Sequence, residues 1–175
     1  MKIVAGCDVG SLTSKAVIMK DGKIIGSSII KSKPRPKDSA DAALEAALKD
    51  AGISKNDIQY IIGTGYGRDK IGFVNEVVSE ITCHGKGARW LLPSVETVID
   101  IGGQDCKTVK IDEDGQVVKF TANDKCASGT GRFLEVMAKV LGISVDDLGK
   151  LSLKAIIHDA GGATQAGVAE AGAPR

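Results

Sequence analysis

The sequence predicts an α/β fold in which helices flank a mixed sheet. Two observations predict it: short apolar runs bounded by turn residues alternate with amphipathic segments, and one strand–turn–strand pattern occurs twice. The chain has 175 residues, of which 43% are apolar and 26% charged, with a formal net charge of +1. This near-neutral balance gives no electrostatic reason to expect a nucleic-acid or membrane partner.

The first half of the chain contains four predicted strands and two predicted helices. Asp21-Gly22 is a strong hairpin signal, Gly52 follows the end of an apolar stripe, and Pro93 stops the second helix. The basic, proline-bearing segment 31–37 is expected to be a solvated connector. The strands are expected at 1–9, 15–20, 23–30 and 58–64, and the helices at 39–51 and 81–92.

An internal repeat links two distant segments, CDVGSLTSKAVIMKDGKII (7–25) and IDIGGQDCKTVKIDEDGQVV (99–118). Each has an aspartate, an apolar residue, a glycine and a small residue. A lysine follows seven positions after the aspartate, as in Asp8 and Lys15 and in Asp100 and Lys107. Each segment then continues into a strand, an Asp-Gly turn and a returning strand. Agreement at this many positions favours duplication over chance.

A duplicated Asp-x-Gly turn suits the binding of a polyphosphate. Glycine lets the backbone approach a phosphate closely, and an aspartate beside it can hold hydrated Mg²⁺. The alternative is that both segments are ordinary β-hairpins with glycine where the strands bend. Asp8 and Asp100 are the candidate magnesium ligands, and the candidate phosphate-binding residues are Gly10, Ser11, Thr13, Lys15, Gly102, Gly103 and Gln104.

Cys126 precedes a predicted helix at 129–141, which Gly142 ends. Free N–H groups and the dipole at a helix N-terminus favour an anion, and a thiolate is such an anion. Cys126 is therefore a candidate reactive or metal-binding thiol, the alternative being a capped loop cysteine. Phe133, Leu134, Met137, Val140 and Leu141 form the predicted apolar side of the helix.

The other three cysteines are expected to be reduced packing residues, since no disulfide spacing is present and a cytoplasmic location is expected. Cys7 and Cys106 fall in predicted strands and are assigned to the core. Cys83 and His84 are adjacent on a predicted helix, so their side chains diverge by about 100° and joint metal ligation is not expected.

Four further stretches carry a resemblance to a known family: TGYGR, SEITCHGKGA, VIDIGGQD and NDKCASGTGRFLEVMAKVLGI. They are similar to the ATPase activators of 2-hydroxyacyl-CoA dehydratases and to the ATPase subunits of benzoyl-CoA reductases. DVGSLTSK and DIGGQDCK resemble the two phosphate motifs of the wider actin-like (ribonuclease H-like) ATPase superfamily. The resemblance covers about residues 1–153.

The resemblance implies a homodimer with one [4Fe–4S] cluster at its interface, ATP and Mg²⁺ as further cofactors, and ATP-driven transfer of one electron to a dehydratase. Cys126 matches the first cluster cysteine. Asp8, Asp100 and Gln104 become the candidate catalytic residues, with Gln104 suited to orient a water molecule. A ferredoxin or flavodoxin is the implied electron donor.

The chain departs from the family pattern near its end. We expect an N-terminal ATPase lobe at 1–121, a cluster loop and the start of a truncated second lobe at 122–155, and an atypical tail at 156–175. From position 160 to 173, ten of fourteen residues are alanine or glycine. Such a segment has little apolar area to offset its ordering entropy.

Two other functions stay open at this point. A small-molecule kinase of the same superfamily would need an acidic base, and DIGGQD offers only Asp105, on the hairpin itself. An inactive structural fragment is the third possibility, because the second lobe is expected to be truncated. Truncation could also impair the activator function, since two Cys126 thiolates from a dimer are half of the four that a cubane cluster takes.

Overall fold

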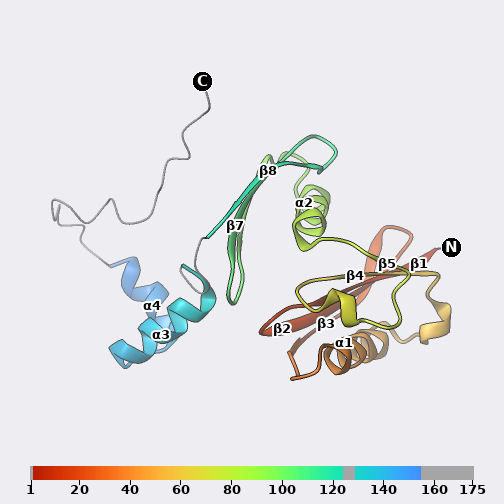
Figure 1. Cartoon of the computed structure of the whole chain (residues 1–175), viewed down its shortest axis with the longest axis horizontal. Helices are drawn as coiled ribbons and strands as arrows, with labels where there is room; N and C mark the ends of the chain where they lie inside the picture. Colours follow the sequence, from red (N-terminus) through yellow and green to blue (C-terminus); the bar gives the residue numbers. More distant parts are fainter. Residues whose placement is uncertain (1, 124–128, 155–175) are drawn as a thin grey trace. The chain divides into compact units, whose positions relative to one another are not determined.

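The computed structural model describes residues 2–123 and 129–154 (Figure 1). Cys126 and the predicted tail at 156–175 lie outside the described residues. The chain divides into two compact units, Met1–Phe133 and Leu134–Arg175. Among the described residues, no helix is long and apolar enough to span a membrane.

The first unit begins with a five-stranded mixed sheet in the order β3-β2-β1-β4-β5. β1 (Ile3–Val9), β2 (Thr13–Lys20) and β3 (Lys23–Lys31) form an antiparallel meander. β4 (Tyr60–Thr64) and the short β5 (Glu76–Val77) continue the sheet in parallel. The Asp21-Gly22 turn has positive φ at both residues, 48° and 80°, as a two-residue type I′ turn requires. The predicted first hairpin is confirmed.

Helix α1 (Pro36–Ala51) covers this sheet (Figure 1) and begins three residues earlier than predicted. Pro36 lies in the first turn, where its missing N–H and fixed φ are compatible with a helix. Part of the expected connector is therefore helical. The C-terminal glycine was predicted correctly, since Gly52 adopts φ 66°. The core beneath α1 comprises Ala5, Ala16, Ile18, Ala43, Leu44, Ala47 and Ile61.

The contact between β3 and α1 predicts a measurable cost for one added methyl group. A Cβ atom at Gly26 would lie 2.6 Å from Cβ of Ala51 and 2.7 Å from the carbonyl oxygen of Ala47. We expect Gly26→Ala to lower the free energy of unfolding by about 1–3 kcal/mol, because the helix backbone cannot yield locally. Urea denaturation measures it, with Gly6→Ala in β1 as the control, since a Cβ there meets nothing within 4 Å. Equal stability of the two variants would contradict this packing.

The rest of the first unit holds a separate three-stranded antiparallel sheet, β6 (Thr97–Ile101), β7 (Cys106–Ile111) and β8 (Val117–Ala122). Helix α2 (Glu80–Leu91) precedes it and is capped by Ser79, whose hydroxyl accepts a hydrogen bond from the Thr82 N–H. Two short 3₁₀ helices, Lys55–Asp57 and Arg68–Lys70, were not predicted. The predicted mixed sheet is thus the five-stranded one, and the second hairpin belongs to a separate antiparallel sheet.

The two meanders have the same register. Asp8 is paired with Lys15 across β1 and β2, and Asp100 is paired with Lys107 across β6 and β7. Each central strand also has a register shift at the matching place, between Ile18 and Met19 in one repeat and between Lys110 and Ile111 in the other. The repeat found in the sequence is therefore a repeat of backbone structure.

Helix α3 (Gly131–Leu141) starts in the first unit and continues into the second, which also contains α4 (Val145–Ser152). α3 ends at Gly142 with φ 69°, as predicted. α4 was missed, although Ser144 and Asp147 carry the Ser-x-x-Asp pattern of a capped N-terminus: the Ser144 hydroxyl accepts from the Asp147 N–H at 3.1 Å.

Candidate functional site

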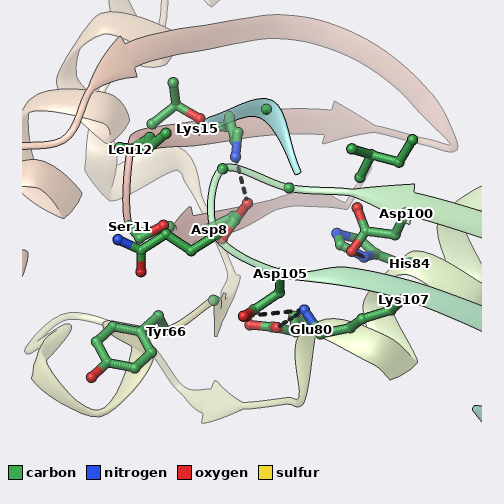
Figure 2. A pocket seen from close by; sticks show the side chains of 18 residues that line it. Asp8, Ser11, Leu12, Lys15, Tyr66, Glu80, His84, Asp100, Asp105 and Lys107 are labelled. Atoms are coloured by element: carbon green, nitrogen blue, oxygen red, sulfur yellow. Dashed lines mark hydrogen bonds and ion pairs between the residues drawn. The ribbon is translucent and has the colours of Figure 1, made fainter. Parts of the chain in front are cut away.

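A pocket of about 460 Å³ lies between the turns of the two repeats, within the first unit (Figure 2). Its size falls in the range of small-molecule sites. It brings together every candidate residue named from the sequence except Cys126. These lining residues are Asp8, Gly10, Ser11, Thr13, Lys15, Asp100, Gly102, Gly103 and Gln104.

The two turns that face this pocket are closed by equivalent hydrogen bonds. The Gly10 N–H donates to the Thr13 carbonyl at 3.1 Å, and the Gly102 N–H donates to the Asp105 carbonyl at 2.8 Å. A Cβ atom would lie 2.7 Å from the Thr13 oxygen at Gly10 and 3.1 Å from the Asp105 oxygen at Gly102. A side chain at Gly10 would therefore force the first turn to shift, and one at Gly102 would crowd the second turn.

Several backbone donors in these turns are available to a ligand. Within residues 2–123 and 129–154, no hydrogen-bond acceptor is found for the N–H groups of Ser11, Gly103 and Gln104. All three residues line the pocket. Free N–H groups in a turn can form a concave site for an anion, which suits phosphate oxygens.

The second turn also contacts the first turn and the start of α3. Gly103 packs against the side chain of Leu12, leaving no room for a Cβ atom. The N–H groups of Gly131 and Arg132 donate to the carbonyls of Gly102 and Gly103 at 3.0 and 3.2 Å. The start of α3, which follows the segment containing Cys126, is thus hydrogen-bonded to the second turn.

Asp8 is held from two sides. Its Oδ2 atom accepts a hydrogen bond from Nζ of Lys15 at 3.1 Å. Its Oδ1 atom lies against Gly65, which has φ 88°. The sequence did not single out Gly65, although it belongs to the glycine-rich loop after β4; its positive φ and its contact with Asp8 emerge only from the fold.

Asp100 contacts a residue that the sequence did not assign to the site. Nδ1 of His84, on α2, lies 3.1 Å from Oδ2 of Asp100, and both residues line the pocket (Figure 2). The His84 side chain is 40% exposed and faces the carboxylate, so packing, the default assignment for a helix residue of this kind, does not describe it.

The sequence also showed no sign of an ion-pair group around Lys107. Nζ of Lys107 lies 2.8 Å from Oε1 of Glu80 and 3.3 Å from Oδ2 of Asp105. The Lys107 side chain is only 11% exposed. Burial alone lowers its pKa, but the Glu80 and Asp105 carboxylates more than compensate, so the pKa of Lys107 lies above its ordinary value. Lys107 therefore stays protonated at neutral pH.

The charges of the pocket fit a divalent cation. Its lining includes four carboxylates, on Asp8, Glu80, Asp100 and Asp105, against two lysines. A polyphosphate alone would meet an excess of negative charge, which Mg²⁺ would offset. No group of three or more metal-binding side chains is found in the part of the chain that the structure describes. Mg²⁺ bound with a nucleotide does not need one, because phosphates and water supply most of its ligands.

The cysteines differ in their surroundings. Cys7 is fully buried, and burial, with smaller contributions from Asp8 and Asp41, raises the pKa of its thiol to about 12. Its assignment to the core is confirmed. Cys106 begins β7 and is half-buried, as is Cys83 on α2. Cys126 lies outside the described residues, so its predicted exposure and its place before α3 stay predictions.

Comparison with known proteins gives a consistent result. The model of the BadF/BadG/BcrA/BcrD ATPase family matches residues 5–171. The activator of lactoyl-CoA dehydratase from Anaerotignum propionicum is 46% identical over 150 residues, which are 86% of this chain and 58% of that protein. The (R)-2-hydroxyglutaryl-CoA dehydratase activating ATPase from Acidaminococcus fermentans is 43% identical, over 85% of this chain and 57% of that protein. The chain thus spans less than two thirds of the length of these relatives.

Solved structures that resemble this chain lead to the same group of proteins. Component A of the (R)-2-hydroxyglutaryl-CoA dehydratase of A. fermentans superposes with a TM-score of 0.82 at 40% identity, covering 89% of this chain and 60% of that one. The activator of the 2-hydroxyisocaproyl-CoA dehydratase from Clostridium difficile, with bound ADPNP, gives 0.79 at 40% identity, covering 88% and 57%. The fold is that of the actin-like ATPases, as predicted from the two phosphate motifs.

Proposed function

Because the chain belongs to the BadF/BadG/BcrA/BcrD ATPase family, we propose that it binds Mg²⁺–ATP between its two hairpin turns and serves as an ATP-driven activator of a 2-hydroxyacyl-CoA dehydratase. The observation that carries the proposal is the pair of matched turns, each with a glycine at its tightest point and an aspartate two residues before it, around one pocket. The relatives named as dehydratase activators supply the substrate class.

In this proposal the free N–H groups of Ser11, Gly103 and Gln104 bind phosphate oxygens, together with Gly10, Thr13 and Gly102. Lys15 adds a positive charge, and Asp8 and Asp100 hold hydrated Mg²⁺. The Gln104 amide is the candidate for orienting the attacking water. No carboxylate other than Asp105 follows this turn directly, and Asp105 is paired with Lys107, so phosphoryl transfer to a substrate hydroxyl is less well supported than hydrolysis.

The electron-transfer part of the proposal depends on Cys126. We propose that it is a ligand of a [4Fe–4S] cluster shared between two copies of the chain, with a ferredoxin or flavodoxin as electron donor and a cytoplasmic location. When bound, the cluster would supply a low-potential electron. Support from the fold comes from the hydrogen bonds between the start of α3 and the Gly102-Gly103 turn, because they connect the proposed nucleotide site with the segment that follows Cys126. The division of the chain into an ATPase lobe at 1–121, a cluster loop with the start of a second lobe at 122–155, and a tail at 156–175 is part of the same proposal.

The reactivity of the cysteines tests the cluster assignment. In metal-free protein at pH 7 we expect Cys126 to be alkylated first and Cys7 last, because Cys7 is buried and its pKa of about 12 leaves almost no thiolate. Anaerobic reconstitution with iron and sulfide should then protect Cys126 and leave the rate at Cys83 unchanged. Mass spectrometry of alkylated peptides measures both.

The matched control is Cys126→Ser, which should lose the fast-labelling site and bind no iron, whereas Cys83→Ser should keep both. Two results would contradict the assignment: Cys126 labelling as the slowest of the four cysteines, or iron content that does not change in Cys126→Ser.

A further inference from the structure

The two repeats have the same backbone register but different side-chain partners. In the first repeat the paired residues contact each other, since Nζ of Lys15 lies 3.1 Å from Oδ2 of Asp8. In the second repeat Asp100 and Lys107 occupy the same paired positions, yet the structure brings them into no ion pair. The backbone allows the contact in one repeat, so other side chains prevent it in the other. One of them is Asp105 in the second turn, 3.3 Å from Nζ of Lys107, where the first repeat has Thr13.

Helix α2 supplies the nearer carboxylate to Lys107 and a side-chain contact for Asp100. Glu80 and His84 are four residues apart, so they lie on one side of the helix. Oε1 of Glu80 lies 2.8 Å from Nζ of Lys107, and Nδ1 of His84 lies 3.1 Å from Oδ2 of Asp100 (Figure 2). Within the described residues, no helix side chain forms an ion pair with Asp8 or Lys15, and there the lysine stays on its own aspartate.

The separation changes what each aspartate can do. Asp8 already has an ammonium ion at 3.1 Å, which competes with any cation. Asp100 has no ammonium partner among the described residues, and its side chain is 21% exposed toward the pocket that it lines. The two aspartates are therefore equivalent in the repeat but unequal as ligands for a divalent cation.

We propose that Glu80 is a positioning residue that holds Lys107 away from Asp100 and so makes the second repeat the metal-binding one. This rests on the proposed Mg²⁺–nucleotide site. Without the Glu80 carboxylate, Lys107 keeps only its longer contact of 3.3 Å with Asp105, whose side chain is half exposed, and it can adopt the arrangement that Lys15 has in the first repeat. The Lys107 ammonium then forms an ion pair with the Asp100 carboxylate and displaces Mg²⁺ from it.

The experiment measures how much Mg²⁺ strengthens nucleotide binding, as the ratio of the dissociation constants for ADPNP in EDTA and in Mg²⁺, by calorimetry at millimolar nucleotide. Glu80→Gln should lower this ratio about tenfold, a size typical of losing a residue that supports a metal ligand. The double variant Glu80→Gln, Lys107→Met should restore it to within about twofold of the parent, because the competing ammonium is gone. Asp41→Asn, on the exposed face of α1, is the control that leaves it unchanged.

A merely structural role for Glu80 gives the opposite pattern, since removing both partners of the ion pair would then be at least as damaging as removing one. A double variant that is not rescued overturns the inference, as does an unchanged ratio in Glu80→Gln. If Glu80→Gln fails to fold, Lys107→Met decides: a ratio at or above the parent value supports the inference, and a tenfold fall overturns it. A parent chain whose ADPNP binding does not respond to Mg²⁺ instead overturns the proposed function.

Discussion

Replacing Asp100 with asparagine is expected to lower Mg²⁺-dependent ATP hydrolysis about 100-fold or more. The asparagine side chain would keep the shape of the aspartate and lose the negative charge that places the cation beside the phosphates. Removing one group that stabilises charge in the transition state lowers the rate of the chemical step by about two orders of magnitude. Release of inorganic phosphate at saturating Mg²⁺ and millimolar ATP is the measurement.

The design of the Asp100 experiment separates loss of the cation from loss of the fold. Thermal unfolding of Asp100→Asn should stay close to that of the parent, because the Asp100 carboxylate contacts a half-exposed histidine and, among the residues that the structure describes, forms no ion pair with a lysine or arginine. Asp41→Asn, whose carboxylate pairs with Lys37 on the surface of α1, should hydrolyse ATP at the parental rate. Full hydrolysis by Asp100→Asn would remove Asp100 from the proposed magnesium site.

The second large effect is expected at Gly65. A Cβ atom there would overlap Oδ1 of Asp8 and lie 2.6 Å from the carbonyl oxygen of Val9, and the φ of 88° is itself unfavourable for alanine. Because the obstructing carbonyl belongs to β1, the strand cannot move aside. Gly65→Ala should therefore cost about 2–4 kcal/mol of the free energy of unfolding, combining backbone strain with overpacking.

Gly65→Ala should also weaken ADPNP binding about tenfold, because the displaced Asp8 carboxylate can no longer keep both its place in the pocket and its contact with Lys15. Chemical denaturation and calorimetry measure the two effects. Gly72→Ala is the matched control in the same loop region, since a Cβ there meets nothing within 4 Å. A Gly65→Ala protein as stable as Gly72→Ala would mean that Asp8 is not confined in this way.

Local patterns were sufficient to predict most of the elements and the repeat. The Asp21-Gly22 turn fixed the first hairpin, Gly52 and Gly142 fixed two helix ends, and the matched Asp and Lys spacing predicted two equivalent meanders. These features depend on φ preferences and on residues a few positions apart, which is why the sequence alone carries them. The boundaries were less exact, as at Pro36, where proline was taken as a loop signal although it also starts helices.

The sequence by itself determined which residues are proposed to bind a phosphate and a metal, because the chemistry of Asp-x-Gly turns is local. Only the tertiary structure decided their partners. Glu80 and His84 on α2 precede the Asp100 and Lys107 hairpin by some twenty residues, and Gly65 meets Asp8 through the pairing of β4 with β1. Such contacts depend on how distant elements pack, and no spacing along the chain encodes them. That is the physical reason why two repeats with one pattern hold their aspartates in different surroundings.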